Sequence, residues 1–107
     1  PNQADNALIS ATYAISSDDE RISLIEFALL SHPSSSSTAL AGAQLSMLPI
    51  SLKKTYPIKF LQGEYSRQIG NNEEAIRHWF DILNHIPADS DQARTLRLYI
   101  SKLEKAF

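Results

Sequence analysis

Four residues that can bind metal ions or transfer protons recur within one short stretch, at Glu74, His78, Asp81 and His85. Their spacings of four, three and four residues would place all four side chains on one face of a helix. Imidazole and carboxylate groups are also ligands that zinc accepts in proteins. The row therefore supports one hypothesis, a metal-binding helical domain.

The opposite face of the same stretch is apolar, which favours a simpler interpretation. It carries Ala75, Ile76, Trp79, Leu83 and Ile86. Because an amphipathic helix turns a polar face toward water, the acidic and imidazole side chains fit a solvated surface better than a metal site. We therefore expect no bound metal.

The remaining candidates for catalysis lack partners in the sequence. The four consecutive serines at 34–37 have no G-x-S-x-G setting, and we interpret them as a connector and the cap of the next helix. His32 precedes Pro33 at an expected helix end, where an imidazolium is favoured by the helix dipole. Three scattered glycines form no phosphate-binding loop, and without cysteine there is no thiol chemistry. We predict no enzymatic activity and no cofactor.

Composition limits the possible partners. The chain has 107 residues, 43% of them hydrophobic and 21% charged, which suits a single folded domain. A net charge of −2 with scattered Lys and Arg argues against nucleic-acid binding. No apolar run approaches the roughly 20 residues that span a bilayer, so we expect no membrane insertion by this segment. Because the first residue is Pro1 and the sole methionine is Met47, we expect a piece of a longer protein.

The periodicity of the apolar residues predicts an all-α fold with about six antiparallel helices. The expected helices cover residues 2–15, 17–31, 38–48, 57–69, 72–86 and 89–107, with an exposed loop at 49–56. Capping-box spacing joins Ser17 to Glu20 and Asn71 to Glu74 at two of the predicted starts. The helix at 17–31 is apolar on nearly every side, so we expect it to be the most buried element.

The segment 57–87 resembles a tetratricopeptide repeat, a hairpin of two helices. The residues that carry this resemblance are Gly63, Gly70, Ala75, Trp79, Leu83 and Pro87, although Gln62 and Ser66 stand where the family usually has a leucine and an aromatic residue. The resemblance implies a repeat hairpin at 57–87 and a capping helix at 89–107. It also suggests a degenerate hairpin at 1–33, separated from the repeat by an extra helix and loop at 38–56.

In the repeat family the first helix of each hairpin lines a concave face that holds a peptide. Carried over to this chain, the resemblance implies a peptide-binding site at Pro57, Phe60, Leu61, Glu64, Arg67 and Gln68. Phe60 is the expected apolar anchor, while Glu64 and Arg67 would discriminate among polar partners. Phe60 and Glu64 occupy the positions where some co-chaperone members carry a lysine and an asparagine that hold a terminal carboxylate, which argues against that branch.

A narrower resemblance covers residues 73–106, which are similar to the C-terminal end of tetratricopeptide subunits of bacterial cytochrome c maturation and nitrite reductase assembly. It implies a periplasmic or membrane-tethered protein that holds the C-terminal segment of an apocytochrome c or contacts a haem lyase subunit. The first alternative is a general scaffold or oligomerisation domain of a larger protein, in the cytoplasm or the cell envelope. The second is the metal-binding helical domain described above.

Overall fold

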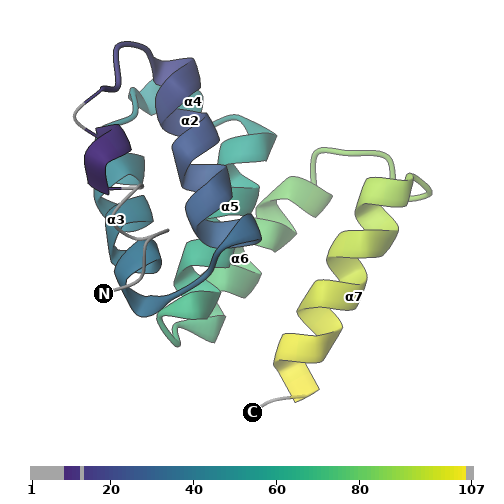
Figure 1. Ribbon diagram of the computed structural model, residues 1–107. Helices are drawn as coiled ribbons and strands as arrows, with labels where there is room; N and C mark the ends of the chain where they lie inside the picture. Colours follow the sequence, from purple (N-terminus) through teal and green to yellow (C-terminus); the bar gives the residue numbers. More distant parts are fainter. Residues whose placement is uncertain (1–8, 13, 106–107) are drawn as a thin grey trace. The chain divides into compact units, whose positions relative to one another are not determined.

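The computed structural model describes residues 9–12 and 14–105, and this part of the chain is helical without strands (Figure 1). The all-α prediction is therefore confirmed. Seven helical elements lie between residues 18 and 105, where five helices were expected. The helix expected at 17–31 is divided into an α-helical and a π-helical element, and the segment 49–56 contains an additional short helix. Most of the helix predicted at 2–15 lies outside the described residues. Within that range, residues 9–12 are described and are helical.

The chain divides into two compact units, Pro1–Lys53 and Lys54–Phe107. The first unit contains α2 (Asp18–Glu26), a π-helical segment η1 (Phe27–Ser31), α3 (Ser35–Ser46) and α4 (Ile50–Lys53). The second contains α5 (Tyr56–Gln68), α6 (Asn72–Leu83) and α7 (Asp91–Lys105).

Serine side chains begin both long helices of the first unit. The Ser17 hydroxyl accepts a hydrogen bond from the Glu20 amide at 3.2 Å, as its spacing predicted, while the Glu20 carboxylate accepts from the Ser16 amide. The Ser34 hydroxyl accepts from the Ser37 amide at 3.0 Å. The serine tract is thus a cap followed by the first helical turn, so α3 begins three residues earlier than expected.

The core of the first unit forms where α2 and η1 pack against α3. Its buried apolar residues are Leu24, Ile25, Ala28, Leu29, Ala41, Leu45 and Leu48. Phe27 and Leu30 lie outside this core and are 45% and 49% exposed. The prediction that 17–31 would be the most buried element is therefore wrong, because its apolar residues surround the helix and α3 does not cover all sides.

The segment 49–56 is exposed as predicted, but it is not entirely a loop. The carbonyl of Pro49 accepts hydrogen bonds from the amides of Leu52 and Lys53 at 3.0 and 3.1 Å, which closes the single turn of α4. Proline is well tolerated at a helix start because its missing N–H would have no partner there. Pro49 therefore begins α4, whereas α3 already ends at Ser46, before the predicted end at 48.

The second unit is built on the α5–α6 hairpin. Gly70, in the turn, has φ +87°, the left-handed conformation that glycine adopts without a steric cost. The Asn71 side chain accepts from the Glu74 amide at 3.2 Å and begins α6 as predicted. The helix ends at Leu83, before the predicted 86, so Pro87 lies beyond its end and does not terminate it directly.

The last helix, α7, begins two residues later than expected, where the Ser90 hydroxyl accepts from the Ala93 amide at 3.1 Å. It packs against α6, and the resulting core contains Trp79, Ile82, Leu96 and Ile100. Within the described residues, no helix combines the length and apolar character needed to cross a membrane.

Candidate ligand-binding groove

An open groove of about 510 Å³ lies in the second unit. Its lining comes from the start of α5, the C-terminal end of α6 with the following turn, and the first half of α7: Tyr56, Pro57, Phe60, Ile82, Ile86, Asp91, Gln92, Thr95, Leu96 and Tyr99. These side chains are aromatic or aliphatic on the walls, with hydroxyl, amide and carboxylate groups among them. We refer to this feature as the α5–α7 groove.

Three aromatic rings form a cluster at the groove. The ring of Phe60 stacks on Trp79 at a centroid distance of 6.1 Å, and Tyr99 lies 6.0 Å from Phe60 and 5.6 Å from Trp79. Trp79 is only 1% exposed, whereas Phe60 and Tyr99 also line the groove. The buried indole thus supports two rings that a ligand can contact.

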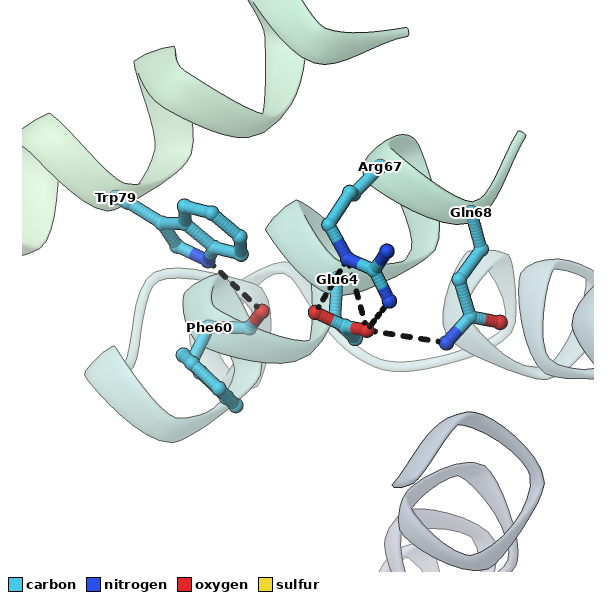
Figure 2. A network of polar contacts seen from close by, with 5 residues as sticks. All are labelled: Phe60, Glu64, Arg67, Gln68 and Trp79. Atoms are coloured by element: carbon cyan, nitrogen blue, oxygen red, sulfur yellow. Dashed lines mark hydrogen bonds and ion pairs between the residues drawn. The ribbon is translucent and has the colours of Figure 1, made fainter. Parts of the chain in front are cut away.

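The indole is fixed by a contact with the backbone of α5. Figure 2 shows its N–H directed at the Phe60 carbonyl, to which it donates a hydrogen bond of 3.3 Å. A side chain on a helix extends toward the N-terminus, so a Cβ at Gly63 would cover the carbonyl one turn earlier. Such a Cβ would lie 2.7 Å from Trp79 Cδ1. Gly63 is therefore the residue that lets the ring reach the backbone.

The structure separates the six predicted site residues into two groups. Pro57 and Phe60 line the α5–α7 groove, Phe60 half-buried and Pro57 exposed. Leu61 is 3% exposed and belongs to the core. Glu64, Arg67 and Gln68 do not line the groove and instead bind one another.

Glu64 accepts all the hydrogen bonds of this polar network. The guanidinium of Arg67 donates from Nε at 3.1 and 3.2 Å and also pairs through Nη2, while the Gln68 amide donates at 3.1 Å (Figure 2). The hydrogen bond with Glu64 raises the pKa of Arg67. Because Glu64 is buried and its carboxylate is satisfied within its own helix, the expectation of an exposed carboxylate for polar discrimination does not fit this geometry.

Sequence reasoning missed the second wall of the groove. Gln92, Thr95 and Tyr99 follow one another at steps of three and four along α7, beside the buried stripe of the same helix. The sequence predicts a capping helix at 89–107, and none of these three residues is among the predicted site residues. The helical spacing of these residues was the available signal, and only the position of α5 shows that the row faces a partner helix.

The acidic residues among Glu74, His78, Asp81 and His85 form separate ion pairs with basic side chains instead of gathering at one point. Glu74 binds Arg77 at 2.7 Å and lies 3.5 Å from His78 Nε2, while Asp81 pairs with Lys59 and lies 3.8 Å from His85. Partial burial is the main cause that lowers the pKa of His78, against the opposing effect of Glu74. Among the residues that the structure describes, no three His, Asp or Glu side chains gather into a possible metal site.

A scan against models of protein families, a search of curated proteins and a search of solved structures each find no match for this chain. What the groove can do follows from its own surface. Concave, largely apolar walls with a few convergent polar groups are typical of binding sites. An aromatic cluster supported from below offers anchoring surface for an apolar side chain at a small entropic cost.

Proposed function

We propose that this chain is a non-catalytic binding module of the tetratricopeptide type, which holds a segment of a partner protein in the α5–α7 groove. The observation that carries the proposal is the groove itself, with Phe60 and Tyr99 on its walls and Trp79 beneath them. Aromatic side chains in concave sites are the residues that most often dominate binding energy at protein interfaces.

Three features suit the groove to a peptide. Its 510 Å³ falls within the range of small-ligand pockets and accommodates a few side chains. The ring of Phe60 stacks on Trp79 and also contacts Tyr99 in a tilted arrangement, so it loses little rotamer freedom when a ligand binds. The hydroxyl of Tyr99 and the amide of Gln92 add groups that can hydrogen-bond a peptide backbone.

As the specific partner we propose the C-terminal segment of an apocytochrome c, presented to a haem lyase in the periplasm. The support is the resemblance over residues 73–106, since this stretch supplies seven of the ten lining residues, from Ile82 to Tyr99. The scaffold or oligomerisation alternative, in the cytoplasm or the envelope, draws on a different observation. Ile50 and Met47 in the first unit are 71% and 61% exposed, as at a surface that another chain covers.

Isothermal titration of the full chain with apocytochrome C-terminal peptides tests the proposal. Thr95→Tyr places a ring in the groove from an exposed helical position, and we expect it to weaken binding at least tenfold. Leu98→Tyr is the matched control, because Leu98 lies on the same helix, is 62% exposed and does not line the groove. Phe60→Ala should weaken binding as well. Because this change also removes a contact with Trp79, the melting temperature of the variant must be measured to separate a loss of binding from a loss of stability.

The outcomes separate the alternatives. Binding lost in Thr95→Tyr and kept in Leu98→Tyr supports the groove. Equal binding by wild type and both variants would place the peptide elsewhere. If no apocytochrome peptide binds the wild type, while the chain associates with itself or with unrelated proteins through Met47 and Ile50, the scaffold alternative is supported.

A further inference from the structure

We infer that the α5–α7 groove selects segments in which a lysine or arginine stands next to an apolar residue. This inference rests on the proposed peptide-binding function and specifies which peptides it admits. The apolar residue would contact Phe60 and Leu96, and the cation would lie between the aromatic rings and Asp91.

The electrostatic character of the lining favours a cation. Asp91 is the one lining residue whose side chain is charged at neutral pH, and the lining contains neither lysine nor arginine. Tyr56, Phe60 and Tyr99 add ring faces, which carry partial negative charge and attract ammonium and guanidinium groups. Carboxylate and rings thus act in the same direction, and an acidic side chain would be repelled by both.

The cations near the groove already have partners in the described part of the chain. Arg67, whose pKa also responds to Tyr99, is paired with Glu64, and Lys59 is paired with Asp81. Arg97 donates to the Ala88 carbonyl at 2.9 Å. None of these three side chains lines the groove. Their charges therefore compete only weakly with a ligand cation for the groove.

Asp91 itself can change partner. Its ion pair with Arg94 joins two side chains that are 93% and 64% exposed and only three residues apart. Pairs of this kind contribute little to stability, because water screens them and both side chains lose freedom. A ligand cation that also stacks on the rings makes contacts that Arg94 does not replace. Exchange of Arg94 for the ligand is thus favourable.

A random dodecapeptide library displayed on phage, selected on the full chain, provides the ligands. Peptides that bind the wild type but bind the Thr95→Tyr variant weakly or not at all are taken as groove binders. We expect lysine or arginine beside an apolar residue to be enriched among them. One such peptide is then synthesised in three forms, with arginine, with the neutral isostere citrulline, and with glutamate at the same position. Binding is followed by calorimetry and by the fluorescence of Trp79, the only tryptophan.

We expect the arginine peptide to bind about three- to tenfold more tightly than the citrulline peptide, and the glutamate peptide to bind most weakly. Asp91→Asn should remove most of the difference between arginine and citrulline. Asp89→Asn is the control, because Asp89 is exposed nearby and does not line the groove. Its selectivity should equal that of the wild type.

Groove-dependent peptides that show no preference among the three forms, or that prefer glutamate, would overturn the inference and leave the peptide-binding function intact. Selectivity that persists in Asp91→Asn but disappears in Asp89→Asn would also overturn it. A library that yields no peptide sensitive to Thr95→Tyr would overturn both the inference and the proposed function of the groove.

Discussion

Replacing Gly63 by alanine should destabilise the second unit, although the same change elsewhere in a helix is normally favourable. The added Cβ would lie 2.7 Å from Cδ1 and 2.9 Å from Cε2 of Trp79, closer than real Cβ contacts. Those atoms belong to a rigid ring that is 1% exposed, so the ring cannot simply rotate into solvent. The helices α5 and α6 must separate, or the indole must move off the Phe60 carbonyl.

The expected magnitude follows from three contributions. Forcing an extra carbon into a packed core costs about 1 to 3 kcal/mol. Weakening the hydrogen bond between Trp79 and the Phe60 carbonyl costs about a further 1 kcal/mol. Alanine recovers about 1 kcal/mol through its higher helix propensity. We therefore expect the free energy of unfolding to fall by roughly 1 to 3 kcal/mol.

The test is a double-mutant cycle in which urea unfolding is measured. Circular dichroism is the probe, because one background lacks tryptophan and cannot be followed by its fluorescence. In a Trp79→Leu background the clash is absent, so Gly63→Ala should become neutral or stabilising by up to about 1 kcal/mol. The change of sign is the decisive feature. If Gly63→Ala is stabilising in the wild-type background too, the close approach of α5 and α6 at Gly63 is refuted.

Further predictions concern other parts of the second unit. Trp79→Ala should cost about 3 to 5 kcal/mol in denaturant melts, because a buried ring is removed; a loss below about 1 kcal/mol would show that the indole is peripheral. Arg67→Ala should destabilise more than Glu64→Gln, since it leaves a buried carboxylate without its cation, whereas an unpaired Arg67 can be hydrated; equal losses would contradict this. His78 has a lowered folded pKa, so its contribution to stability is complete above about pH 6.5 and is lost as pH falls below that value. The unfolding midpoint of His78→Gln should therefore change less between pH 7 and pH 5 than that of wild type. A chelator should leave the far-ultraviolet circular dichroism spectrum unchanged, and a loss of helicity would revive the metal hypothesis.

The helices were predictable because the signals that define them are local. The spacing of Asn71 and Glu74 predicted the start of α6, since a helix cap depends only on neighbours within one helical turn. Errors occurred where two local signals compete. Proline suits both the segment after a helix and the start of the next helix, and only the hydrogen bonds that the Pro49 carbonyl accepts from Leu52 and Lys53 show that it begins α4.

The site was less predictable, because residues on one helical face need not meet the same partner. Phe60 and Glu64 are four positions apart and were assigned to one ligand-facing row. In the structure Phe60 contacts Trp79 and Tyr99, while Glu64 is buried among its own i+3 and i+4 neighbours. Helical periodicity specifies a direction from the axis, but not which element covers that direction.

Tertiary packing determines which element covers a given face of a helix. In this protein the glycine at position 63, which has no side chain, is important for that packing. The absence of a Cβ at Gly63 lets Trp79 lie against α5, and the indole in turn contacts Tyr99 on α7. Residues 63, 79 and 99 are far apart in sequence, so no local window contains this relation. The groove wall therefore depends on a packing contact on its buried side, and for this reason Gly63→Ala should impair peptide binding as well as stability.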